Sequence, residues 1–286
     1  MSSNLTLSAM LSALLATGPA SPGQWYQSAI SAMQRMTQPR YMTYRTTVPA
    51  GDSSIVISRD EQGQAEMSVV EGPSGPQSWN VDYREADGTA AFTLADGTRA
   101  LSHLAILDPT WRGAYTWLRH GIGSQVAPLP TPPPVQSPQP GVSAEPQPPL
   151  PVVAFVTAID PHAYDIRDGG DEACSDGRPG HRVWTHARTD PVSHPLAGAV
   201  IDRASLRFCT LIFREHTEQH VLMLDLDVEL HFGQVGAYYL TTGGIVTGAV
   251  RPYKRPGWFR LGSSFVYDNF TFPASLPGAT FELPAS

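Results

Sequence analysis

The sequence predicts a mainly β (α+β) protein, in which an antiparallel sheet packs against two helices, and three observations carry this prediction. From Val221 to Phe232, apolar and polar residues alternate, as in a strand with one buried face. Strand-length runs recur along the chain, separated by turn residues such as Asp87-Gly88 and Asp96-Gly97. Two other segments have the residue spacing of amphipathic helices.

The alternating stretch offers the first candidate binding surface. A turn is expected at Gly233 to Gly236, and Gly243-Gly244 divides the residues that follow, so the stretch from Val221 to Val250 predicts an antiparallel meander. Asp225, Asp227, Glu229 and His231 share the polar face, which we interpret as a solvent-facing stripe. The apolar face carries Leu222, Leu224, Leu226, Val228, Leu230 and Phe232.

The first helix is expected to open at Ser21-Pro22, and the residues from Gln24 to Met36 follow the helical spacing. Ser21 can cap the free N–H groups at its start, and Pro22 suits its first turn. Pro39 ends it, because proline restricts the residue before it. The expected apolar face contains Tyr26, Ala29, Ile30 and Met33.

The second helix is expected between Asp108, as the cap, and Gly121, with Pro109 at its first position. Its apolar face would hold Trp111, Ala114, Tyr115 and Leu118. A face with so much aromatic surface indicates a large buried contact with the sheet. It is either a lid over a ligand cavity or ordinary core packing, and the second interpretation is the more common one.

Two segments stand apart from the predicted sheet. Residues 126–151 are proline-rich and favour extended polyproline II geometry, which cannot form a core. We interpret them as an exposed insert in a single domain of residues 21–286, with a ligand for an SH3-like domain as the alternative. Residues 1–20 are expected to be a leader or a weak signal peptide, since they lack the usual positive charge.

Composition excludes two classes of partner. The formal net charge is -7, and Lys and Arg form no cluster that could neutralise a row of phosphates, so no nucleic acid is expected. No run of 18 or more apolar residues occurs, so the chain is not expected to span a membrane. Cys174 and Cys209 are either a disulfide or two free thiols, and we favour free thiols, with Cys209 buried in a strand.

No motif predicts catalysis, a metal site or a cofactor. The zinc-protease, nucleophile-elbow and phosphate-loop patterns are all missing from the sequence. Acidic residues gather between Asp165 and Asp176, but their spacing does not match a calcium loop, and we interpret them as a solvated hairpin loop. We therefore expect a protein that is not an enzyme.

The layout resembles that of the bacterial lipoprotein carriers LolA and LolB. Val235 to Leu240, Gly243 to Val250 and Phe265 to Pro273 are similar to the closing hairpins of that group, and Pro195 to Leu211 is similar to the paired strands before them. The resemblance implies a curved antiparallel half-barrel whose apolar concave surface is covered by helices and holds acyl chains. The proline-rich insert is foreign to that pattern, and no lipobox cysteine stands near the N-terminus.

These observations predict a non-enzymatic carrier for a lipid, acyl chain or other apolar ligand in the bacterial cell envelope. The alternative is an envelope scaffold or protein-interaction module with a filled core and an unknown protein partner. The expected location is periplasmic or secreted, with the cytoplasm as the alternative. The residues expected to line the apolar site are Leu222, Leu224, Leu226, Val228, Leu230, Trp111, Tyr115 and Leu118.

Overall fold

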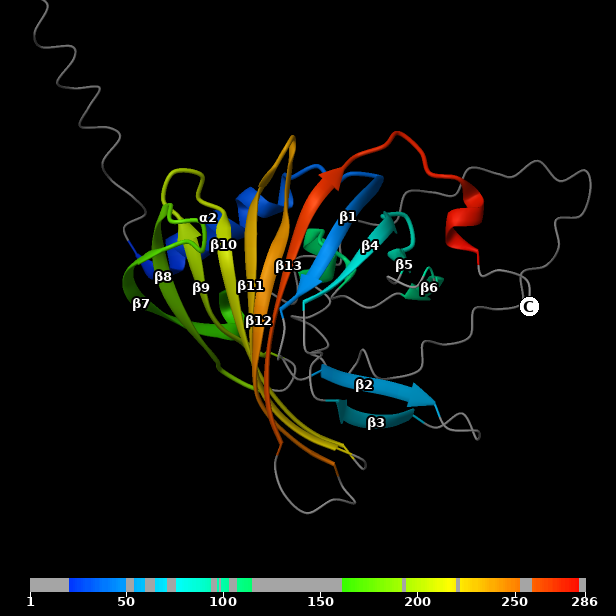
Figure 1. The fold of residues 1–286 in the computed structure, drawn as a ribbon. Coiled ribbons are helices and arrows are strands. Elements are labelled where there is room, and N and C mark those ends of the chain that lie inside the picture. Colours follow the sequence, from blue (N-terminus) through cyan, green and yellow to red (C-terminus); the bar gives the residue numbers. More distant parts are fainter. Residues whose placement is uncertain are drawn as a thin grey trace, which may run out of the picture.

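The fold is an open, curved antiparallel sheet of eleven strands, seen in a computed structural model (Figure 1). This confirms the predicted mainly β class. The sheet order is β6-β5-β4-β1-β13-β12-β11-β10-β9-β8-β7. The structure describes residues 21–49, 54–59, 65–70, 76–93, 97, 99–102, 107–114, 161–191, 194–219, 222–252 and 259–282.

Most of the sheet is a meander in chain order, from β7 to β13. N-terminal β1 then pairs with C-terminal β13 and so joins the two ends of the chain. The strands of the sheet are β1 (Tyr41–Val48), β4 (Gln77–Arg84), β5 (Thr89–Thr93), β6 (Arg99–Ser102), β7 (Tyr164–Ala173), β8 (Pro179–Ala187), β9 (Leu196–Asp202), β10 (Phe208–Gln219), β11 (Leu222–Val235), β12 (Tyr238–Pro252) and β13 (Phe259–Thr271).

Two strands lie outside this sheet. β2 (Ser54–Arg59) and β3 (Ala65–Val70) pair only with each other, so β1 pairs with β4 rather than with the strand that follows it. The short helices η3 (Pro161–Ala163) and η4 (Gly278–Phe281) precede β7 and follow β13.

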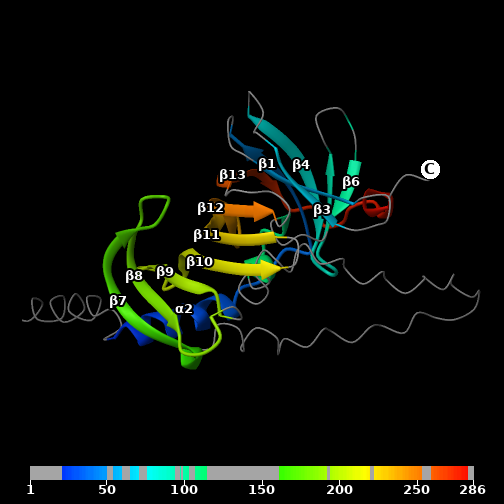
Figure 2. The same cartoon turned by 90° about the horizontal axis from the view of Figure 1, so that it is seen from below.

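Helix α2 (Pro22–Gln34) lies on the concave side of the sheet and contacts β7, β8, β9 and β10 (Figure 2). Its start confirms the prediction, because the Ser21 side chain accepts a hydrogen bond from the backbone N–H of Gln24 and Pro22 occupies the first turn. The buried face contains Trp25, Tyr26, Ala29, Ile30 and Met33.

Strand β12 corrects one prediction. Gly243-Gly244 does not divide it, and the strand runs unbroken from Tyr238 to Pro252 with a bulge opposite His231. A Cβ atom on Gly244 would lie 2.5 Å from the Glu229 carbonyl oxygen and 2.6 Å from the Phe265 ring. The glycine therefore marks a close approach inside the sheet and not a turn. The turn itself lies at Gly236-Ala237, and Gly233 belongs to β11.

The acidic segment is also more regular than predicted. Asp165, Asp168, Asp171 and Glu172 lie in strand β7, and only Asp176 lies in the hairpin turn. The strand accommodates them through a bulge between Asp168 and Gly170, next to its pairing with β8. Charged side chains and a bulge on an edge strand oppose pairing with a second chain.

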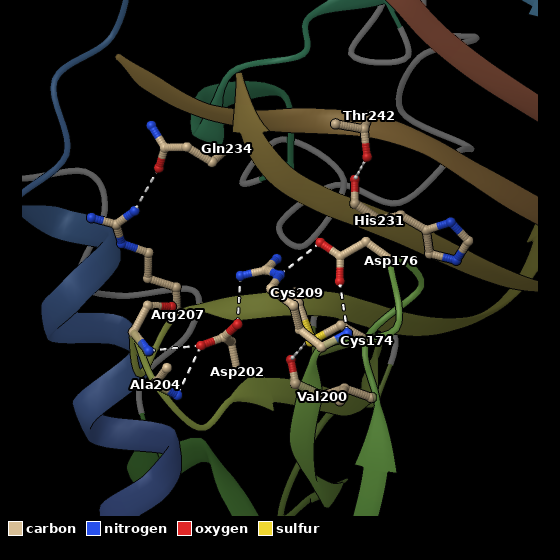
Figure 3. Close-up of polar contacts among 12 residues, drawn as sticks. Cys174, Asp176, Val200, Asp202, Ala204, Arg207, Cys209, His231, Gln234 and Thr242 are labelled. Carbon is tan, nitrogen blue, oxygen red and sulfur yellow. Dashed lines mark hydrogen bonds and ion pairs between the residues drawn. A yellow bond between two sulfur atoms is a disulfide. The ribbon is translucent and has the colours of Figure 1, made fainter. Parts of the chain in front are cut away.

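The prediction of free thiols is wrong, because Cys174 and Cys209 form a disulfide (Figure 3). Their Cα atoms lie 5.6 Å apart, within the usual range for such a bond. Cys174 follows β7 and Cys209 lies in β10, and both pack with Val200 of β9 in a small cluster. The strands β8 and β9 fold between the two cysteines in the sequence, so spacing in the chain could not reveal the contact.

Arg178 and Asp202 reinforce the same end of the sheet. The Arg178 guanidinium donates to the buried Asp202 carboxylate at 2.5 Å and to Asp176 at 2.7 Å. Asp202 also accepts hydrogen bonds from the N–H groups of Ala204 and Ser205, in the turn before β10 (Figure 3). The β7–β8 and β9–β10 turns are thus tied together beside the disulfide.

Candidate functional site

The apolar side of β11 lies on the concave face, as its alternation predicts. Leu226, Val228 and Leu230 are buried in the main core, whereas Asp225 and Asp227 are exposed on the opposite face. The side chains of Leu222 and Leu224 are outside the described part of the chain, although their backbones pair with β10 and β12.

Residues 107–114 cross this concave face, and we call them the strap. The Tyr44 hydroxyl of β1 donates to the Leu107 carbonyl at 2.6 Å, and the Thr241 N–H of β12 donates to the Pro109 carbonyl at 2.7 Å. The Trp111 ring then lies 6.0 Å from the ring of Phe208 in β10. The strap therefore follows the order β1-β13-β12-β11-β10 across the sheet.

The sheet leaves a docking point for the strap at Thr241. Strand β12 pairs with β13 only from Gly243 onward, so the ladder to β13 does not use the N–H group of Thr241. Pro109 supplies a carbonyl acceptor at this point and has no N–H group of its own to satisfy. The bulge in the β11–β12 pairing lies beside this point, where the ladder to β13 ends and the contact with the strap begins.

Trp111 is the main apolar contact of the strap. Its ring stacks on Phe208 at an interplanar angle of 9° and also lies 6.0 Å from the ring of Phe232. Tyr26 of α2 contacts the same Phe208, with ring centroids 5.5 Å apart. Phe208 is therefore the point at which α2, the strap and the sheet meet.

Asp108 is the buried polar anchor of the strap. The residue is 7% exposed, and its carboxyl group accepts hydrogen bonds from the N–H and hydroxyl groups of Thr110. The Arg112 guanidinium lies 3.9 Å away and donates to the Glu85 carbonyl. Burial raises the pKa of Asp108, and its hydrogen bonds and Arg112 offset part of this effect. The predicted helix begins at Trp111, two residues later than expected.

The remaining predicted residues divide into two groups. Trp111 lies with Leu226, Val228 and Leu230 in one continuous core cluster, which also includes the buried face of α2. Tyr115 and Leu118 lie outside the described residues, as do residues 1–20 and 126–151.

A group of tyrosines on the concave face was not predicted from the sequence. Tyr44 of β1, Tyr83 of β4 and Tyr267 of β13 are buried around Asp108, and burial raises the pKa of each hydroxyl. The alternation of β1 and β4 places Tyr44 and Tyr83 on the same side of the sheet as the β11 leucines. The alternation that places these two tyrosines is visible in the sequence, but no residue near them in the chain links β1 or β4 to Asp108.

The convex face has a different character. Glu229 and His231 are joined at 2.8 Å, and this contact holds the pKa of Glu229 below its usual range. No group of three or more His, Cys, Asp and Glu residues that could hold a metal occurs among the residues that the structure describes. In the same part of the chain, no helix is long and apolar enough to cross a membrane.

Replacing Tyr44 by Phe tests the attachment of the strap. The variant Tyr44→Phe loses the hydroxyl that donates to Leu107, so we expect a loss of about 1 kcal/mol in the free energy of unfolding. We also expect faster amide exchange within 107–114, measured by mass spectrometry. Tyr41→Phe on the opposite face of β1 is the matched control and should leave this exchange unchanged. Equal exchange in both variants would contradict the attachment.

Comparison with known proteins finds similarity to solved structures. The chain matches no protein-family model and no curated protein. Among solved structures it is similar to a putative outer membrane lipoprotein-sorting protein domain from Vibrio parahaemolyticus, at 10% identity and a TM-score of 0.37, covering 90% of this chain and 95% of that one. It is also similar to a LolA superfamily protein from Nitrosomonas europaea, at 10% identity and a TM-score of 0.34, covering 90% and 97%.

A third similar structure is MucB in complex with MucA(peri), at 10% identity and a TM-score of 0.25, covering 91% of this chain and 95% of that one. The expected architecture, an open curved antiparallel sheet with helical segments on its concave side, is confirmed by the structure itself.

Proposed function

We propose that the protein is a non-enzymatic binding protein that holds an acyl chain or another apolar ligand on its concave face, beneath the strap. One observation carries the proposal. The apolar face of the sheet is covered there by residues 107–114, which lie on the sheet without pairing in it as a strand. A ligand can enter beneath such a cover without breaking the sheet.

An acyl chain beneath the strap would bury the rings of Phe208 and Phe232, which Trp111 covers in the closed structure, at about 25 cal/mol per Å². The strap must lift to admit the chain, and this releases the carbonyls of Leu107 and Pro109 to water. Their donors, the Tyr44 hydroxyl and the Thr241 N–H, then need water or a polar group of the ligand, because an unsatisfied buried donor costs about 1 to 3 kcal/mol. The proposed lining remains Leu222, Leu224, Leu226, Val228, Leu230, Trp111, Tyr115 and Leu118.

The disulfide supports a location in the periplasm or outside the cell. Disulfides persist in oxidising compartments and are rare in the cytosol. The Cys174–Cys209 bond joins two parts of the sheet that lie 35 residues apart in sequence, which is the pattern of a structural staple.

A protein-interaction module is the second candidate function, and the convex face favours it. Trp184 is 44% exposed there, Ile245 40% and Val266 48%. The Arg182 guanidinium stacks 4.5 Å from the Trp184 ring centroid. Tryptophan and arginine are enriched among the residues that dominate protein interfaces. In this alternative the concave core is filled by the protein's own side chains.

Quenching of tryptophan fluorescence by brominated fatty acids separates these functions. Bromine quenches only nearby indoles, so an acyl chain on the concave face should quench Trp111. We expect the quenched amplitude to fall strongly in Trp111→Phe and to persist in Trp184→Phe, the matched variant on the convex face. Quenching that disappears only in Trp184→Phe, or no quenching and no lipid in the purified protein, would refute the concave site and favour the interaction module.

A further inference from the structure

The strap has a titratable group at the point where it is attached most firmly to the sheet. Asp108 follows Leu107, whose carbonyl is held by Tyr44, and precedes Pro109, whose carbonyl is held by Thr241. The two backbone contacts thus flank the carboxyl group on both sides. A change in the free energy of burying this carboxyl group therefore changes the free energy of closing the strap.

Among the described residues, the surroundings of Asp108 contain one positive charge and several neutral hydroxyl groups. Three adjacent strands present Tyr44, Tyr83 and Tyr267 to it, and the strap itself presents Thr110 and Arg112. Burial raises the pKa of all three tyrosines from an already high value, so they stay protonated at any physiological pH. Of the groups in this cluster that the structure describes, Asp108 alone therefore changes charge in mildly acidic solution.

The positive charge compensates for that of Asp108 only in part. The closest approach between the Arg112 guanidinium and the Asp108 carboxylate is 3.9 Å, which is beyond hydrogen-bond distance. Arg112 instead donates to the Glu85 carbonyl, in the turn between β4 and β5. An ionised Asp108 thus loses its water shell in the closed strap in exchange for the Thr110 hydrogen bonds and one long ion pair with Arg112.

We propose that the strap is a proton-controlled cover, which the protonated Asp108 carboxyl group holds closed over the concave face and which ionisation of that group loosens. In the proposed function, this would make access to the apolar face depend on pH, and to that extent the proposal rests on the proposed function. The closure itself needs no ligand, and it can therefore be measured separately.

The direction follows from linkage. The pKa of Asp108 is raised in the closed strap, whereas in an open strap the group is solvated and has its ordinary value near 3.9. The closed state therefore binds the proton more tightly, and acid favours closing. As pH rises through the raised pKa, the equilibrium constant for opening increases by at most about tenfold per pH unit, because one proton is released. Above that pKa the constant becomes independent of pH.

Fluorine NMR of protein labelled with fluorotryptophan measures the opening. The Trp111 resonance is assigned by its loss in Trp111→Phe, and the exposed Trp184 serves as an internal control. From about pH 4 to about pH 8, we expect the Trp111 signal to shift toward its open, solvated position. Asp108→Asn should remove this pH dependence and keep the strap closed, since an amide can still accept from the Thr110 N–H. The control Asp176→Asn replaces another turn aspartate that accepts from a backbone N–H, and should titrate like the wild type.

Two results would overturn the proposal. One is a Trp111 profile in Asp108→Asn equal to that of the wild type, and the other is a wild-type profile that is flat or opens toward acid. If Asp108→Asn does not fold, carbon NMR of the wild-type carboxyl groups decides, because an Asp108 pKa at or below the ordinary value also rejects the proposal. Failed fatty-acid binding with an intact Trp111 titration would instead reject the proposed function alone.

Discussion

Replacing Phe208 by Ala is expected to lower the free energy of unfolding by about 3 to 5 kcal/mol. Phe208 is fully buried, and its ring contacts both Tyr26 of α2 and Trp111 of the strap. The deletion leaves a cavity between three elements, which cannot all collapse into it because the β10 backbone is held between β9 and β11. The loss is measured by urea unfolding followed by circular dichroism.

A matched control and a coupling measurement make this prediction specific. Phe272 is a half-buried aromatic residue beyond the end of β13, and Phe272→Ala should cost less than about 2 kcal/mol. The double variant Phe208→Ala, Trp111→Ala should show a coupling energy of about 0.5 to 1.5 kcal/mol, since the two rings stack. A loss below about 1 kcal/mol for Phe208→Ala, or strictly additive effects, would mean that the strap does not pack on β10.

Removing the disulfide is expected to have the second largest effect. Cys174→Ala together with Cys209→Ala should lower the free energy of unfolding by about 3 to 4 kcal/mol, because the bond closes a loop of 35 residues in the unfolded chain. The loss should appear mainly as a lower urea midpoint. A thiol-reactive label applied to the denatured, unreduced wild-type protein should modify neither cysteine.

Reductant provides the control for this pair. It should destabilise the wild-type protein by an amount similar to the double substitution, and it should leave the double variant unchanged. Labelling of both cysteines without reduction, in protein recovered from an oxidising compartment, would contradict the disulfide. The buried positions of Cys174 and Cys209 predict that the native bond resists reduction until the protein unfolds.

Local sequence patterns predicted the helix start and the buried faces correctly, because these features depend on residues that are close together in the chain. Ser21 and Pro22 define the start of α2, and the spacing of Tyr26, Ala29, Ile30 and Met33 defines its buried face. The alternation in β11 correctly assigned Leu226, Val228 and Leu230 to the concave side. These features depend on helical and strand periodicity, which a chain carries without reference to distant contacts.

Local patterns failed where a residue's role depends on a distant strand. Gly243 and Gly244 have the composition of a turn, but the carbonyls of Glu229 and Phe265 and the Phe265 ring require glycine inside a continuous strand. The acidic residues of β7 similarly have the composition of a loop, and their pairing with β8 makes them a strand. In both cases tertiary contacts overrode residue preference.

The sequence by itself therefore determined the mainly β fold class, the concave apolar strand and the helix that begins at Pro22. Tertiary structure alone decided the pairing of β1 with β13, the Cys174–Cys209 bond and the path of the strap across five strands. The physical reason is that periodicity is a property of adjacent residues, whereas strand pairing, the disulfide and the strap bring together groups that are far apart in the chain. Asp108 shows the difference most clearly, since its sequence context predicts a helix cap and only the folded sheet surrounds it with tyrosines.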